Sequence, residues 1–408
     1  MKARLLSEKI APALSALNEN PYLAAIRAGM VSIAPLTIIG GLFMIISYLP
    51  LSGWEKKVAP YLPLLQIPVT ATFGLLAVFA TFAIAYDFGK QLKQEAIVSA
   101  SMATLIFLLI SLKLEDSSLV MDNLGSKGLF TAIVIALICV RVQKFFTDRN
   151  LVIKLPPNVP AVVYESFLSL APMFFLVVVF WVIRFVCGFD INGLIQTAFK
   201  PLVFALNTLP GILCYAFLVT MLWSVGINGD NAMDAFVAPI FLQYLAHNVA
   251  AVQQHAPLPY TTAYGFFTTF VNVGGTGATI ALALIMLNSK EPGFRKVSRL
   301  SLPTQIFQIN EPIFFGFPIV LNPIFMAPYI LNALILTCGS YLLMYAGIIQ
   351  KPFVNVPWTT PPIIGHYLVT GGDWKAAVWG AVSILIAMAV YYPFAKAAER
   401  QRLAQEGA

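Results

Sequence analysis

The sequence predicts an all-α polytopic membrane protein with about ten transmembrane helices and with re-entrant hairpins in its C-terminal half. Of the 408 residues, 59% are apolar and only 11% are charged, whereas an ordinary soluble domain carries about 25% charged residues. Long apolar runs recur between short polar breaks, and roughly 20 apolar residues suffice for one helical crossing. Soluble enzymes, nucleic-acid binders, secreted disulfide-rich domains and disordered chains fit this composition poorly.

The apolar runs place the expected crossings in order along the chain. The runs are continuous, whereas strands of a membrane barrel would alternate over about 10 residues. The expected crossings cover residues 28–50, 67–86, 95–112, 128–147, 165–187, 204–225, 232–250, 263–288, 324–346 and 376–395.

The formal net charge of +7 comes from lysines and arginines that gather in particular breaks. Such residues mark cytoplasmic loops, so we expect both termini in the cytoplasm. Lys56 and Lys57 then lie outside, as the exception. The basic positions are Lys2, Arg4, Lys9, Lys90, Lys93, Arg141, Lys144, Arg149, Lys154, Lys290, Arg295, Lys296, Arg299, Lys396, Arg400 and Arg402.

The chain changes character near residue 190. Residues 148–164 are rich in proline, which stiffens connections and stops helices, and residues 189–203 are expected to form a short interfacial helix. The first half is plainly apolar, whereas the second half carries Gly, Pro, Asn and Asp inside its apolar stretches. We therefore expect a division into residues 1–188 and 189–408.

The segment LWSVGINGDNAMDAF is the first polar interruption of the second half. Polar groups at membrane depth are costly and usually functional. Trp223 offers an apolar face on which a sugar ring can stack, and Asn228, Asp230 and Asn231 offer donors and acceptors for hydroxyl groups. The alternative is an ordinary polar loop between two helices.

The segment NVGGTGATIAL is the second interruption. Gly274, Gly275 and Thr276 would let the backbone approach a ligand, or would let two helices pack closely. A nucleotide-binding P-loop does not fit, because the motif lacks its lysine and follows no strand.

The segment SLPTQIFQINEPIFFGFPIVLNP is the third and most informative interruption. Its prolines oppose a continuous helix and favour a broken or re-entrant hairpin whose turn lines a cavity. There Glu311 would bind sugar hydroxyls and, as the catalytic residue, could accept a proton from an attacking hydroxyl. The alternative is a carboxylate that caps a broken helix end.

Trp358, in NVPWTTPPIIGH, is either a stacking platform or an interfacial anchor. The three histidines and four cysteines are scattered without metal or redox spacing. We therefore expect no metal site and no cofactor.

Together these segments resemble the membrane IIC component of phosphotransferase-system sugar permeases of the lactose/cellobiose/diacetylchitobiose class. The resemblance runs from about residue 20 to the C-terminus. It implies a homodimer whose N-terminal domain forms the interface, and a C-terminal domain that binds one sugar and moves as a rigid body to give alternating access. It also implies sugar contacts at Trp223, Asn310, Glu311 and Trp358. Its motifs are IKLPPNVPAVVYESF, LWSVGINGDN, GGTGAT, QINEPIFFGFPIVLNP and VPWTTP.

One motif departs from the family. The chain reads Gly-Ile-Asn-Gly over residues 226–229, where the family usually has histidine in place of Asn228. An asparagine forms hydrogen bonds but does not titrate near neutral pH. Asp230, in the same loop, is therefore a hypothetical source of the missing charge.

The resemblance implies uptake of a disaccharide or β-glucoside with transfer of phosphate from a cysteine of a separate cytoplasmic phosphocarrier, IIB, which IIA serves indirectly. The chain would be the permease component of a sugar phosphotransferase in a bacterial plasma (inner) membrane, in contact with membrane lipids. We expect no nucleic-acid partner. Whether the chain is itself an enzyme stays open. Two alternatives remain, an ion-coupled secondary sugar transporter and a sugar-binding membrane receptor without transport. A channel fits least, because no charged ring or filter sequence is present.

Overall fold

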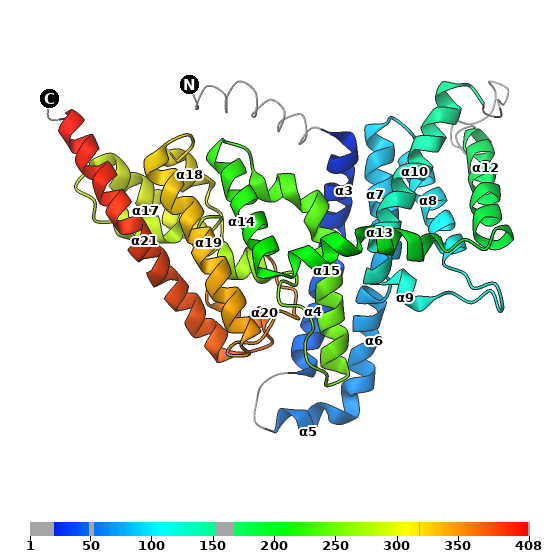
Figure 1. The fold of residues 1–408 in the computed structure, drawn as a ribbon, viewed down its shortest axis with the longest axis horizontal. Coiled ribbons are helices and arrows are strands. Elements are labelled where there is room, and N and C mark those ends of the chain that lie inside the picture. Colours follow the sequence, from blue (N-terminus) through cyan, green and yellow to red (C-terminus); the bar gives the residue numbers. More distant parts are fainter. Residues whose placement is uncertain (1–19, 49–52, 152, 154–166, 318, 407–408) are drawn as a thin grey trace.

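The computed structural model describes residues 20–48, 53–151, 153, 167–317 and 319–406 as an assembly of helices (Figure 1). Within these ranges no β-strand is formed, and an isolated bridge between Leu112 and Leu119 is the nearest approach to one. The expected all-α class is therefore confirmed for the described part of the chain. The basic positions 2, 4, 9 and 154, and most of the proline-rich segment 148–164, lie outside the described residues.

Helices of the first half occupy the right side and the centre of Figure 1. They are α3 (Pro21–Ser32), α4 (Ala34–Ser47), α5 (Trp54–Val58), η2 (Ala59–Tyr61), α6 (Leu62–Phe73), α7 (Leu76–Gln91), α8 (Ala96–Ile110), α9 (Met121–Leu124), η3 (Ser126–Gly128), α10 (Leu129–Asp148), α12 (Leu170–Trp181) and the π-helical turn η4 (Val182–Val186).

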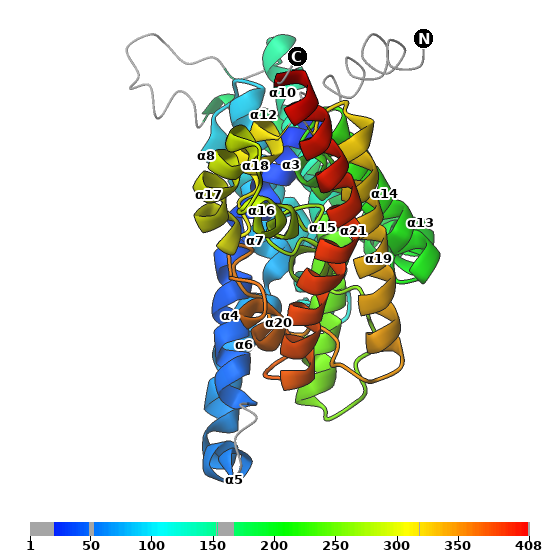
Figure 2. The same cartoon turned by 90° about the vertical axis from the view of Figure 1, so that its left-hand side faces the viewer.

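Helices of the second half begin with α13 (Ile191–Leu206), which crosses the view of Figure 1 horizontally. The long α21 runs beside α19 in Figures 1 and 2. The remaining elements are α14 (Leu209–Ser224), α15 (Gly229–Gln253), the π-helical turn η5 (Phe266–Val271), α16 (Ile280–Met286), α17 (Pro292–Ile306), α18 (Glu311–Gly316), α19 (Pro323–Tyr345), α20 (Ile364–Val369) and α21 (Trp374–Glu406).

The described helices include 6 that are long and apolar enough to cross a membrane. A further pair, 170–186 and 191–206, passes the same test together but is bent by 85°. The chain is thus a multi-pass membrane protein, whereas the number of about ten crossings stays a prediction. The spans are Pro21–Ser47, Lys56–Gln91, Ser126–Asp148, Gly229–Gln253, Pro323–Tyr345 and Trp374–Gln405.

One expected crossing has a different form. Residues 263–288 do not form one helix, because η5 ends at Val271 and α16 begins only at Ile280. Three glycines with left-handed backbone lie between them, at positions 274, 275 and 277. Glycine adopts this conformation without a steric cost, and it ends a helix. The apolar run is therefore folded into a turn that reaches the cavity described below.

Helix α7 is the centre of the first half, where it packs against α3, α8 and α10. The contact with α3 is close because Gly29 faces Ile84: a Cβ atom added at Gly29 would lie 2.4 Å from the Ile84 side chain and 2.7 Å from its backbone nitrogen. Small residues let membrane helices approach in this way. The sequence of α3 thus fixes the position of its helix against α7.

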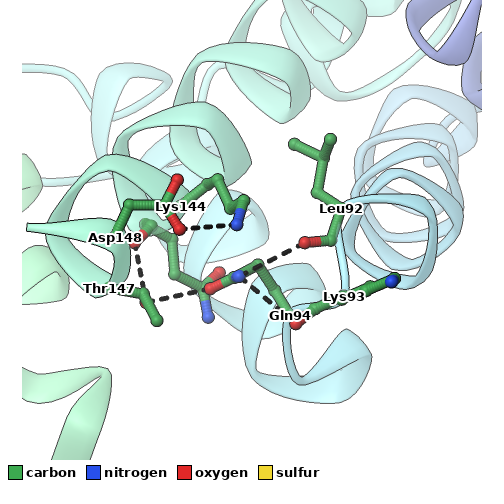
Figure 3. A network of polar contacts seen from close by, with 7 residues as sticks. Leu92, Lys93, Gln94, Lys144, Thr147 and Asp148 are labelled. Atoms are coloured by element: carbon green, nitrogen blue, oxygen red, sulfur yellow. Dashed lines mark hydrogen bonds and ion pairs between the residues drawn. The ribbon is translucent and has the colours of Figure 1, made fainter.

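The turn between α7 and α8 is tied to the end of α10 (Figure 3). Gln94 donates to the carbonyl oxygens of Leu92 and Lys93, at 3.4 and 3.3 Å, and accepts a hydrogen bond of 3.0 Å from Thr147. This network holds two of the basic breaks side by side. In Figure 1 these breaks, the start of α3 and the end of α21 lie at the same end of the molecule.

Two polar contacts join α3 and α4 to the second half. Arg27 donates a hydrogen bond of 3.0 Å to the backbone oxygen of Asn231 in α15. Asn355, in the segment between α19 and α20, donates one of 2.6 Å to the Thr37 hydroxyl of α4. Both contacts lie close to the polar segments that the sequence singled out.

Replacing Gly29 with alanine should lower the stability of the fold. The added methyl group meets backbone as well as side chain, and such overpacking costs about 1–3 kcal/mol, against at most about 1 kcal/mol gained from helix propensity. We expect a lower midpoint of thermal unfolding in detergent. Ser32→Ala, at an exposed position of the same helix, is the control and should change the midpoint little. An unchanged midpoint of thermal unfolding for the Gly29→Ala protein would contradict the close contact between α3 and α7.

Candidate functional site

A cavity of about 310 Å³ lies where α14, α15, the glycine turn and the start of α18 meet. This volume is near the lower end of the range for small-molecule sites. Val31 of α3 and the exposed Trp358 complete its wall, so both halves of the chain contribute. The cavity collects the residues that the sequence proposed for sugar binding, Trp223, Asn228, Asp230, Asn231, Gly275, Thr276, Asn310, Glu311 and Trp358, whereas Gly274 lies beside it and does not line it.

Asp230 accepts hydrogen bonds from three other side chains that line the cavity. One carboxylate oxygen accepts hydrogen bonds from the Trp223 indole at 2.8 Å and from the Thr276 hydroxyl at 2.5 Å. The other oxygen accepts one from the Asn272 amide at 3.1 Å. Hydrogen bonds to a carboxylate are among the stronger ones in proteins. Asp230 therefore fixes the orientation of Trp223 and joins α15 to the glycine turn.

The glycine turn is closely fitted against the segment that carries Asn310. A Cβ atom added at Gly275, where φ is +104°, would lie 2.4 Å from the Asn310 Cβ atom. The Asn310 amide donates a hydrogen bond of 3.0 Å to the Thr276 carbonyl oxygen. Gln308 accepts hydrogen bonds from the backbone nitrogens of Gly274 and Gly275, at 2.8 and 3.1 Å. The second and third polar segments thus form a single wall.

The third segment is broken, as its prolines predicted. Helix α17 ends at Ile306 and α18 begins at Glu311, with Pro312 in its first turn, where proline is tolerated. Glu311 lines the cavity, and its side chain is exposed. Among the described residues, no hydrogen bond or ion pair engages its carboxylate. Glu311 therefore keeps its lone pairs free for a ligand, which Asp230 does not.

The two tryptophans occupy different environments. Trp223 is buried and packs its ring at 71° against Phe314 of α18, with the ring centroids 5.0 Å apart. Trp358 is 57% exposed and lies at the cavity wall. Such an exposed ring is available to stack on a ligand or to lie against lipid headgroups.

Asn228 is the N-cap of α15. Its side-chain oxygen accepts a hydrogen bond of 2.9 Å from the backbone nitrogen of Asn231, as a capping asparagine commonly does. The amide NH₂ group of Asn228 and the second lone pair of its oxygen then remain for a ligand. Asn231 takes part mainly through its backbone, whose oxygen accepts the hydrogen bond from Arg27.

Several residues of the cavity were not predicted from the sequence. Gln308 lies in the same QINEP segment as Glu311, and Asp234 lies one helical turn after Asp230, so each could have been inferred from helix or motif spacing. Asn272 is the first residue of the second polar segment, two residues before Gly274. The aromatic residues Tyr215, Phe241, Tyr264 and Phe267 gave no separate signal, because aromatic residues are common throughout the chain.

The polar groups of the cavity are not arranged as metal ligands. Among the described residues, no group of three or more His, Cys, Asp or Glu side chains has an arrangement that could hold a metal ion.

Comparison with known proteins gives a consistent result. The family model described as "Phosphotransferase system, EIIC" matches residues 27–333. The cellobiose-specific EIIC component of Geobacillus stearothermophilus is 34% identical and aligns over 99% of this chain and 96% of its own length. The lactose-specific EIICB component of Streptococcus mutans is 29% identical over 98% of this chain and 73% of its own length.

Comparison with solved structures agrees with the sequence matches. The crystal structure of the transporter ChbC, the IIC component from the N,N'-diacetylchitobiose-specific phosphotransferase system, superposes with a TM-score of 0.94. The two chains are 33% identical, and the match covers 99% of this chain and 100% of the other.

Replacing Gln308 with alanine should loosen the glycine turn. The backbone nitrogens of Gly274 and Gly275 would lose their acceptor in a buried place, which costs about 1–3 kcal/mol. We expect a lower thermal midpoint in detergent together with weaker sugar binding. Gln254→Ala, at the exposed end of α15, is the matched control. If Gln308→Ala left both quantities at the level of this control, the role given to Gln308 would be wrong.

Proposed function

Because the chain belongs to the EIIC family of the phosphotransferase system, we propose that it takes up a disaccharide or β-glucoside and presents it for phosphorylation by a separate IIB subunit. The relatives named for cellobiose, lactose and N,N'-diacetylchitobiose support a two-ring substrate of this kind. The name EIICB of the lactose-specific relative supports a B component as partner of the C component.

The observation that carries the proposal is the difference between two of the carboxylates that line the cavity. Asp230 accepts three hydrogen bonds from protein donors, whereas no hydrogen bond or ion pair engages Glu311 among the described residues. A sugar that lies against Trp223 or Trp358 presents hydroxyl groups at its rim, and Asn310 and Glu311 can bind them. The cavity thus combines an apolar surface for the ring face with acceptors for the rim.

The proposed chemical step needs one group to receive a proton. The sugar hydroxyl attacks the phosphoryl group on the cysteine of IIB, so an O–P bond forms as the S–P bond breaks. Glu311 orients this hydroxyl and accepts its proton. The thiolate of IIB leaves, and phosphorylated sugar is released into the cytoplasm. No residue of this chain becomes phosphorylated, and Asp230 acts by positioning Trp223 and Thr276.

The proposal extends to the movement of the chain. Residues 1–188 would form the dimer interface of a homodimer, and residues 189–408 would carry the sugar by elevator-type alternating access. The bend of 85° before α13 supports a boundary at this place. The Arg27–Asn231 and Asn355–Thr37 hydrogen bonds would then break and re-form as the transport part moves.

The topology completes the proposal. We infer about ten crossings, with the segments around 274–277 and 308–311 as tips of re-entrant hairpins. Both termini would lie on the cytoplasmic side of a bacterial plasma membrane. The broken helices and the common location of the basic breaks support this arrangement.

Replacing Glu311 with glutamine should separate binding from phosphorylation. Glutamine retains hydrogen-bonding capacity but cannot accept the proton, and loss of a general base lowers rates by roughly 10²–10⁴-fold. We expect retained sugar binding by calorimetry and a loss of phosphosugar formation in vesicles supplied with phosphorylated IIB. Glu115→Gln, at an exposed loop position, is the control.

Three outcomes would contradict the proposal. Full phosphorylation by the Glu311→Gln protein would remove the base role. Uptake that depends on a proton gradient and yields unmodified sugar would favour an ion-coupled secondary transporter, and binding without uptake would favour a receptor.

A further inference from the structure

The cavity extends along α15 beyond the polar groups described so far. Asp230, Asp234 and Phe241 all line it from this helix. At 1.5 Å per residue, Asp234 lies about 6 Å and Phe241 about 16 Å beyond Asp230 along the axis. The cavity is therefore elongated, and its two ends are lined by different residues.

Residues of helix α14 line the same two ends of the cavity, in the reverse order along the sequence. Trp223 bonds to Asp230 at the first end of the cavity. Tyr215, two turns earlier in α14, contacts Phe241 and Phe267 with ring centroids 5.5 and 4.7 Å apart. The backbone nitrogen of Tyr264 donates a hydrogen bond of 3.0 Å to the carbonyl oxygen of Phe241. Four aromatic residues thus surround the second end.

Asp234 lies between these ends and differs from Asp230 in its partners. Among the described residues, no hydrogen bond or ion pair engages its carboxylate, although Arg27 is close enough to attract it electrostatically. The hydroxyl groups of Tyr215 and Tyr264 likewise have no hydrogen-bond partner in the described part of the chain. The Asp234 carboxylate and the two tyrosine hydroxyls therefore keep free hydrogen-bonding capacity in a part of the cavity that is lined by aromatic rings.

A further unpartnered atom points to a ligand in the same cavity. The side-chain oxygen of Asn272 is buried and has no hydrogen-bond partner within the described ranges, while the amide of the same side chain donates to Asp230. Asn272 is 8% exposed and lines the cavity. Because unpartnered buried acceptors cost free energy, a hydroxyl donor on a ligand in this cavity would stabilise the Asn272 oxygen.

We propose that Asp234, Tyr215 and Tyr264 form a second sugar subsite, which binds the ring distal to the one that Glu311 contacts. This inference rests on the proposed function and adds to it the residues that select a two-ring substrate. The aromatic walls contact the apolar face of the distal ring, and the Asp234 carboxylate accepts hydrogen bonds from its hydroxyls. The axial step of about 6 Å from Asp230 to Asp234 is comparable to the width of one pyranose ring.

The test compares a ligand with two rings and a ligand with one. Calorimetry on the purified full chain measures the affinity for cellobiose and for methyl β-glucoside, which lacks the distal ring. In Asp234→Asn we expect about a tenfold weaker affinity for cellobiose, the effect of one hydrogen bond to a charged group, and an unchanged affinity for methyl β-glucoside. In the comparison variant Asp230→Asn, both affinities should fall together.

A second variant keeps the proposal testable where Asp234→Asn does not fold. Tyr264→Phe retains the ring and removes only the hydroxyl, and it should weaken cellobiose binding alone. An equal loss for both ligands, or no loss for cellobiose, would overturn the second subsite. Failure of the unaltered chain to bind either ligand would instead contradict the proposed function itself, so the two failures are distinguishable.

Discussion

The whole site depends on holding a carboxylate, Asp230, in a cavity between membrane-spanning helices. Removing a charged group from water is expensive unless hydrogen bonds compensate for the lost hydration. The donors to Asp230 come from α14 and from the glycine turn, at positions 223, 272 and 276. Satisfying one charge therefore draws together segments that lie more than 40 residues apart in the sequence.

The glycine turn follows from this constraint. A segment that leaves its helix to reach Asp230 exposes backbone groups, which need partners at membrane depth. Gln308 supplies an acceptor for two backbone nitrogens, and the Tyr391 hydroxyl of α21 donates to the Gly277 carbonyl oxygen at 2.8 Å. Only glycine fits at position 277, since a Cβ atom there would lie 2.3 Å from the Tyr329 ring. The turn is thus fixed from both sides.

The sequence predicted the class of fold and the three polar segments, because charge and proline are rare enough in this chain to be informative. Their meeting in one cavity lies beyond what sequence patterns determine, since the contact between Thr276 and Asp230 depends on how distant segments pack. Hydropathy alone predicts one crossing over residues 263–288, because it does not detect a turn with left-handed backbone. Helix spacing alone places Asp234 on the same face as Asp230, but nothing in the sequence shows which of the two aspartates finds donors within the protein.

Asp230 and Glu311 show why the distribution of donors decides function. A carboxylate that already accepts three hydrogen bonds has little capacity left for a substrate hydroxyl, because most of its lone pairs are occupied. Glu311 has no such donors among the described residues, and this is tolerable because its side chain is exposed at the cavity wall, where water solvates it. In the proposed mechanism a sugar replaces that water, its hydroxyls become the donors, and the Glu311 carboxylate would then contact the hydroxyl that must lose a proton. Under this proposal the lack of protein donors makes Glu311 responsive to the substrate, while the donors around Asp230 would keep the surrounding wall in place as the substrate enters.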